Sequence, residues 1–136
     1  MTTSTSSAAA AELEAFRSPG QRFPRVARLR SSREIGAVVR GGERLPGRVV
    51  NLFFAPSPAG RPRVAIVVPK HGHKVVARNL VRRRLREAVR RDGLPAALAS
   101  RAAVDIVLFA KPAAYQASYE ALRDAVVDSM ERACAS

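Results

Sequence analysis

The sequence contains one cysteine and no tryptophan, and it has no long apolar run. Cys134 has no second cysteine to pair with, so an intrachain disulfide is excluded and a Cys/His zinc site is not indicated. No stretch approaches the roughly 20 apolar residues that cross a bilayer. Residues 1–11 lack the basic start and the apolar core of a secretory signal. We therefore expect a cytoplasmic protein in a reducing compartment.

Acidic side chains are also scarce. The chain has 11 Asp and Glu against 24 Lys and Arg, a formal net charge of +13. Such a surface attracts polyanions, which include nucleic acid, an anionic membrane surface or an acidic protein. Lys70, Lys74 and Lys111 are the only lysines. A codon bias would explain this excess of arginine over lysine. Phosphate binding would explain it as well, because guanidinium groups bind phosphates bidentately and stack on bases.

Motifs for protein-based catalysis are absent. The sequence has no recognisable Ser/His/Asp or Cys/His nucleophile motif, no paired carboxylates at a strand end and no Gly-rich nucleotide loop. His71 and His73 lie in a Pro-Lys-His-Gly-His-Lys loop without a nearby Cys or acid, which disfavours a metal site. We expect this loop to meet phosphates through its His, Lys and backbone N–H groups.

A chain of 136 residues has room for one domain. Residues 1–20 are poor in bulky apolar side chains and end in Ser18-Pro19-Gly20, which predicts a flexible arm. Residues 21–136 are expected to form a single RNA-binding domain.

Hydrophobic periodicity predicts helices and strands in the order α-β-β-α-β-α, with room for one extra short strand before Arg48. The predicted helices begin at Ser31 or Ser32, at Val75 and after Ser118, and the predicted strands are residues 48–55, 63–68 and 104–110. We expect the first two strands to form a hairpin. The middle helix, residues 75–91, is expected to end at Asp92-Gly93-Leu94-Pro95.

The middle helix separates two kinds of side chain. At about 100° per residue, one stripe is apolar and packs on the sheet; it contains Ala77, Val81, Leu85 and Ala88. Beside it lies an arc that contains Asn79, Arg82, Arg83, Arg86 and Arg90, with Arg78 at its border. A solvated helix face usually balances such charges with acids at i,i+4, but Glu87 is the only acid here. This favours a surface completed by a polyanion.

The residues alone therefore indicate a basic α/β domain that binds structured RNA or DNA. A ribosomal or ribosome-assembly protein would share the basic helix and arm. A DNA-binding module would place the helix in a major groove, although the helix-turn-helix partner is missing.

The chain resembles the bacterial ribonuclease P protein family over about residues 23–130. The resemblance centres on the stretch KVVARNLVRRRLREAVRR. Residues that match the family signature in order are Arg78, Asn79, Arg82, Arg83, Arg86 and Glu87. Flanking matches include Arg28-Leu29-Arg30, Gly42, Arg48, Val104-Asp105-Ile106-Val107 and Lys111-Pro112.

This resemblance implies an α/β (α+β) two-layer sandwich with a mixed sheet of about four strands and three helices. The arginine helix would join two parallel neighbouring strands by a left-handed crossover, against the usual right-handed preference.

The resemblance further implies the protein subunit of an endoribonuclease, a heterodimer of one protein and one catalytic RNA. The RNA, with bound Mg²⁺, would remove the 5′ leader of precursor tRNA by metal-ion catalysis, so no catalytic side chain and no protein-held metal is expected. The implied RNA-binding residues are Lys70, His71, His73, Lys74, Arg78, Asn79, Arg82, Arg83, Arg86 and Arg90. The implied leader cleft contains Arg28, Arg30, Ile35, Val39, Arg48 and Phe53.

Three departures from the family pattern involve four positions. Leu80 replaces an arginine of the signature, which removes one phosphate contact or moves it to Arg84. Ile35 and Val39 stand where the family usually has aromatic residues, and Pro69 replaces a serine. Phe53 is the remaining stacking candidate, with Phe54 on the opposite face of its strand. We therefore expect leader binding to depend more on charge than on stacking.

Overall fold

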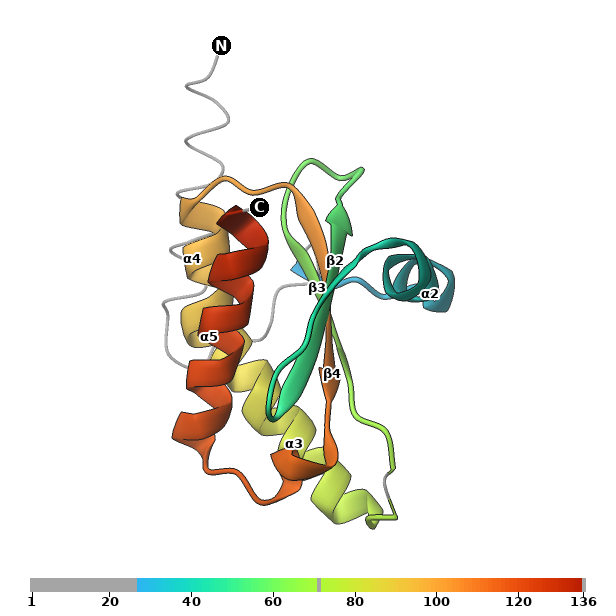
Figure 1. Cartoon of the computed structure of the whole chain (residues 1–136), viewed down its shortest axis with the longest axis vertical. Coiled ribbons are helices and arrows are strands. Elements are labelled where there is room, and N and C mark those ends of the chain that lie inside the picture. The colour runs from blue at the N-terminus through green and yellow to red at the C-terminus, as the bar shows by residue number, and fades with distance from the viewer. Residues whose placement is uncertain (1–26, 71, 136) are drawn as a thin grey trace.

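A sheet of four strands forms the centre of the computed structural model, which describes residues 27–70 and 72–135 (Figure 1). The strands are β1 (Glu43–Leu45), β2 (Val50–Pro56), β3 (Arg63–Val67) and β4 (Val104–Ala110), in the order β1-β2-β4-β3. β2 is antiparallel to β1 and β4, whereas β3 is parallel to β4. The predicted arm, residues 1–20, lies outside the described residues.

The predicted hairpin between β2 and β3 is wrong, because β4 lies between these two strands. β4 is the strand most completely buried on both faces: Val107 on one face and Ile106 and Leu108 on the other are 0% exposed. A strand that is apolar on both faces gains most from a position inside the sheet. The hairpin that does form joins β1 to β2.

The first helix, α2 (Ser32–Gly41), begins where the sequence predicts. The Ser31 hydroxyl accepts hydrogen bonds from the backbone N–H groups of Arg33 and Glu34, at 3.2 and 3.4 Å. Such a cap satisfies donors that the first helical turn leaves without partners.

The middle helix does not end at residues 92–95, which corrects the prediction. α3 (Val75–Ala88) continues through one π-helical turn (Val89–Gly93) into α4 (Leu94–Ala99). Pro95 lies in the first turn of α4, where its missing N–H is best tolerated. The parallel neighbours β3 and β4 are thus joined through α3 and α4, as the resemblance implies; the hand of that crossover stays a prediction.

The sheet has a fully covered face and a partly covered face. α3, α4 and α5 (Tyr119–Ala135) cover one face, and α2 crosses the other (Figure 1). The larger core lies under the three helices, where α5 contributes Leu122 and Val126, both 0% exposed. A smaller cluster under α2 contains Leu29, Val38, Ala65 and Val107. This arrangement confirms the predicted α+β fold.

In the part of the chain that the structure describes, no helix combines the length and the apolar character needed to cross a membrane.

Candidate nucleic-acid interface

The structure confirms that α3 has an apolar side and a basic side. Val81, Leu85 and Ala88 are at most 2% exposed and pack into the larger core. Asn79, Arg83 and Arg86 are exposed, and Arg82 is half-buried. One helix therefore packs on the sheet through one side and offers guanidinium groups through the other.

Two other arginines of α3 are used inside the protein. Arg78 Nη2 donates to the carbonyl of Val68 at 3.4 Å, and its buried Nε has no partner among the described residues. Arg84 Nη1 donates to the carbonyl of Ala117 at 3.3 Å, which ties α3 to the segment before α5. Arg84 is therefore poorly placed to replace the phosphate contact that Leu80 removes.

Arg90 departs from its predicted position in the exposed arc. It is 8% exposed, and its Nη2 and Nε donate to the Glu87 carboxylate at 2.7 and 3.1 Å. The hydrogen bond from Arg90 lowers the pKa of Glu87 and outweighs partial desolvation of the carboxylate. The cause is the π-helical turn that begins at Val89, which changes the angular position of the residues that follow. We therefore remove Arg90 from the exposed set.

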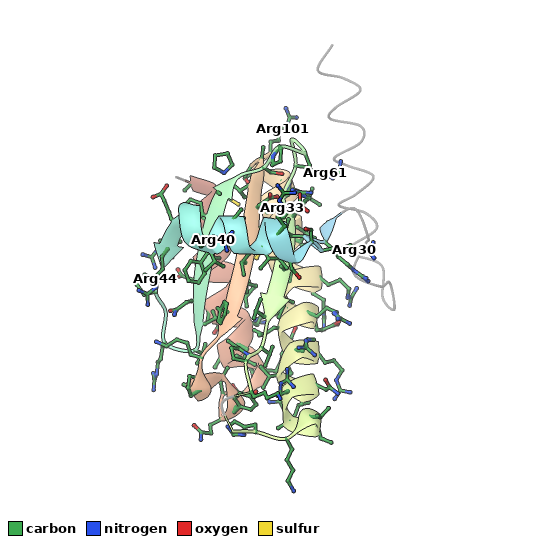
Figure 2. The ribbon with its side chains drawn as sticks, turned by 90° about the vertical axis from the view of Figure 1, so that its right-hand side faces the viewer. Arg30, Arg33, Arg40, Arg44, Arg61 and Arg101 are labelled. Carbon is green, nitrogen blue, oxygen red and sulfur yellow. The ribbon has the colours of Figure 1, made fainter. Side chains whose placement is uncertain are left out.

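A groove brings the two predicted sites together. It lies between the segment before α2, β3 and α3, on the side of the molecule that faces the viewer in Figure 2. Its lining consists of Arg28, Leu29, Arg30, Ile35, Val64, Ala65, Ile66, Arg82 and Arg86. Its volume of about 200 Å³ is below the roughly 300–1,000 Å³ of small-molecule pockets. An open groove with four arginines suits an extended polyanion better than a small ligand.

Val39 and Phe53 lie further along the same face of the sheet, packed against the smaller cluster. The Phe53 ring meets Phe109 edge to face, with centroids 6.1 Å apart and planes at 75°. Phe54 is 6% exposed and belongs to the larger core, so the predicted opposite orientation of the two rings is confirmed.

Arg44 is a candidate that the sequence interpretation missed. It pairs directly with Phe53 across β1 and β2, so the two side chains lie on the same face of the sheet. β1 has only three residues, too few for an alternating pattern. The expected extra strand before Arg48 was therefore the only available signal.

A second missed feature fixes α2 over the sheet. Arg63 on β3 donates to both oxygens of Asp105 on β4, at 2.9 and 2.8 Å, and to Glu34 on α2 at 3.2 Å. Asp105 is 4% exposed, and its hydrogen bond and charge raise the pKa of Arg63. Since Ile35 follows Glu34, this ion cluster sets where the groove wall lies. An acid within the apolar strand 104–110 was the only sequence signal for it.

The loop before α3 is held against the protein by an aromatic contact. The His73 ring stacks on Tyr115, with centroids 3.7 Å apart and planes at 7°. The Tyr115 hydroxyl donates to the carbonyl of Pro69 at 2.9 Å. Lys70 and Lys74 are exposed, whereas His71 lies outside the described residues.

Arg48 does not line the groove. It is exposed in the turn between β1 and β2, because β2 begins at Val50 rather than at residue 48. Val50 pairs with Ala110, the last residue of β4, and β3 runs parallel to β4. Arg48 therefore lies at the same end of the sheet as the loop that carries Lys70.

Residues 27–70 and 72–135 contain no group of three or more His, Cys, Asp or Glu side chains that could hold a metal ion.

Comparison with known proteins gives one consistent result. The ribonuclease P family model matches residues 23–134. The ribonuclease P protein component of Pseudarthrobacter chlorophenolicus is 40% identical over 98 residues, which cover 71% of this chain and 69% of that protein. The Thermus aquaticus component is 39% identical over 94 residues, which cover 69% of this chain but only 52% of that protein.

Solved structures show the same fold. The Thermotoga maritima RNase P protein matches with a TM-score of 0.65 and 22% identity, covering 77% of this chain and 96% of that one. A Staphylococcus aureus RNase P protein matches with a TM-score of 0.64 and 17% identity, covering 79% and 94%.

Proposed function

Because this chain belongs to the ribonuclease P protein family, we propose that it is the protein subunit of a ribonucleoprotein that removes the 5′ leader of precursor tRNA. It would bind one catalytic RNA and one precursor tRNA, in the cytoplasm where transcripts are processed. The arc of Asn79, Arg82, Arg83 and Arg86 would contact structured RNA through phosphates and sugars.

The groove is the observation that carries this proposal. It joins Arg82 and Arg86 of α3 to Arg28 and Arg30 before α2. A strand that runs through it would meet guanidinium groups from both sides and an apolar wall at Ile35. Phe53 and Arg44, further along the same face, would offer a ring for stacking and a cation beside it. These residues position RNA and neutralise its charge.

The chemistry of cleavage would come from the RNA partner and its Mg²⁺ ions. No protein side chain is assigned a role in activating water or stabilising the leaving group. By holding the leader and neutralising phosphates, the protein would raise precursor affinity and lower the magnesium concentration that the RNA needs.

The direct test replaces Arg82, Arg83 and Arg86 by Ala in the full-length protein and reconstitutes it with the RNA of its own genome. We expect the variant to restore precursor cleavage only at raised magnesium, because three phosphate contacts are lost. A loss of about 10- to 1,000-fold in precursor affinity at low magnesium corresponds to roughly 0.5–1.5 kcal/mol per hydrogen-bonded contact.

The control removes charge from a different helix, with Arg123→Ala and Arg132→Ala on α5, whose side chains pair with Asp124 and Asp128. This control should process like wild type. Unchanged processing by the α3 variant at low magnesium would refute the proposal. Co-purification of ribosomal RNA in place of a catalytic RNA would favour a ribosome-assembly role.

A further inference from the structure

A row of arginines follows the outer side of α2, and only its first member, Arg30, also lines the groove. Arg33 and Arg40 are exposed and lie within a narrow arc of the helix, opposite Ile35, Val38 and Val39. Arg30 precedes the helix and Arg44 follows it. In Figure 2, where Arg61 and Arg101 are also labelled, Arg30, Arg33, Arg40 and Arg44 follow one another along the direction of α2.

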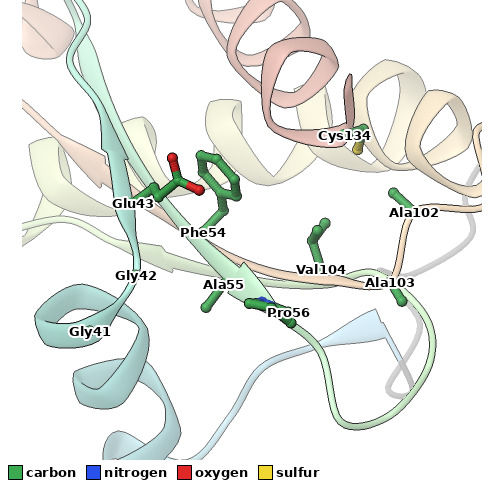
Figure 3. Close-up of a pocket in the computed structure, with 10 residues that line it drawn as sticks. All are labelled: Gly41, Gly42, Glu43, Phe54, Ala55, Pro56, Ala102, Ala103, Val104 and Cys134. Atoms are coloured by element: carbon green, nitrogen blue, oxygen red, sulfur yellow. The ribbon is translucent and has the colours of Figure 1, made fainter. Parts of the chain in front are cut away.

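The acids in this part of the chain do not neutralise the row. Glu34 lies on another side of the helix, where its carboxylate accepts a hydrogen bond from Arg63 at 3.2 Å. Glu43 precedes Arg44 but lies on the opposite face of the sheet, where it lines a pocket with Phe54 and Cys134 (Figure 3). Among the described residues, neither acid forms an ion pair with Arg33 or Arg40.

Gly36 has a specific relation to this row. A Cβ at Gly36 would lie only 2.8 Å from Arg40 Nη1, so the guanidinium of Arg40 folds back over the glycine. This places the group one turn closer to Arg33, on the same side of the helix. A glycine inside a helix is less favourable than alanine. Here it makes room for two like charges to lie along one surface, which is unfavourable until an anion joins them.

We propose that this row, Arg30, Arg33, Arg40 and Arg44, binds the phosphate backbone of single-stranded RNA. Under the function proposed above, on which this inference rests, that strand is the part of the 5′ leader upstream of the segment in the groove. Arg30 supplies the continuity, because it lines the groove and also begins the row. A strand that leaves the groove at the start of α2 meets the outer row next.

The test measures the affinity of the reconstituted holoenzyme for precursor tRNAs whose leaders are lengthened stepwise from the cleavage site. Wild type should gain affinity as the leader fills the groove and gain again as it extends further. The double variant Arg33→Ala, Arg40→Ala should keep the first gain and lose the second, by about two- to thirtyfold, as expected for two exposed ionic contacts. The control is Arg123→Ala with Arg132→Ala on α5.

Gly36→Ala is an independent arm, because it displaces the Arg40 guanidinium without removing a charge. It should weaken binding of the precursor with the long leader. The affinity for the precursor with the short leader and the midpoint temperature of thermal unfolding should be at least as high as in wild type. Full retention of the second gain by the double variant would overturn the inference, and so would an equal loss for short leaders or for the catalytic RNA alone. Absence of any leader-dependent gain in wild type would instead refute the proposed function.

Discussion

The arginines of α3 differ in what their guanidinium groups already bind. Arg84 donates to a carbonyl near α5, and Arg90 is paired with Glu87. Arg83 and Arg86 are exposed on the other side. Residues of one type, a few positions apart, therefore divide into those that stabilise the fold and those that can meet RNA. Mutations within one sequence signature should affect different properties.

Phe53 is also a residue that can contact RNA, and its ring leads to a separate prediction. Phe53→Ala should weaken binding of precursor tRNA by about 1–3 kcal/mol if one leader base stacks on the ring. Mature tRNA, which has no leader, should bind as it does to wild type. The measurement is a pair of equilibrium titrations of the holoenzyme with the two RNAs at one salt concentration.

Because Phe53 also packs against Phe109, Phe53→Leu serves as the control for lost packing. It should keep most of the stability and still bind the leader weakly, whereas Phe53→Tyr should bind like wild type. An equal loss for precursor and mature tRNA would exclude Phe53 from the leader site.

At the scale of elements, the long helical connection between β3 and β4 depends on a close approach to α5. Gly93, at the end of the π-helical turn, is buried against this helix. A Cβ there would lie 2.5 Å from Met130 Sδ and 3.3 Å from Val126 Cγ1. Gly93 is thus required because the packing leaves no room for a side chain. Its backbone conformation is helical, which any residue could adopt.

Gly93→Ala should therefore destabilise the protein, even though alanine favours a helix by about 1 kcal/mol. We expect a net loss of up to about 2 kcal/mol, because overpacking of a tight core typically costs about 1–3 kcal/mol and the helix preference of alanine offsets about 1 kcal/mol of it. Urea unfolding followed by circular dichroism would measure it.

Gly41→Ala is the matched control, since a Cβ at the end of α2 meets nothing within 4 Å. Its stability should stay within about 0.5 kcal/mol of wild type. Equal stability of both variants and wild type would contradict this prediction, because it would show that α5 moves enough to accommodate the added methyl group.

At the scale of the whole molecule, positive charge and scaffold are separated. Twenty of the basic residues but only three acids lie in residues 17–91, whereas six acids and four bases follow. α2 and the basic side of α3 border the partly open face of the sheet, and α5 lies in the layer on the other face (Figure 1). The position of a charge should therefore matter more for RNA binding than its contribution to the net charge.

The salt dependence of RNA affinity tests whether the position of a charge matters more than the net charge. The plot of log affinity against log salt should become shallower by about 2 to 3 when Arg82, Arg83 and Arg86 are replaced by Ala, because each neutralised phosphate contributes about 0.7–0.9 to the slope. The α5 variant, with two arginines removed, should keep the wild-type slope. Similar changes in both variants would mean that a diffuse field governs binding.

The sequence by itself determined the features that depend on neighbours a few residues away. The spacing of Val81, Leu85 and Ala88 defined the packing side of α3, and Ser31 marked the start of α2. The surplus of arginine indicated a surface that attracts polyanions, and the ordered signature from Arg78 to Glu87 identified the family.

Only the tertiary structure decided which distant segments meet. It placed β4 between β2 and β3, continued α3 into α4, and turned Arg90 from the exposed arc into a buried pair. It also joined Arg63, Asp105 and Glu34, and brought Arg28 and Arg30 to one groove with Arg82 and Arg86. These outcomes depend on burying the whole core at once and on pairing the charges that this burial brings together. The spacing of residues along the chain predicts neither, because both involve segments that are distant in sequence.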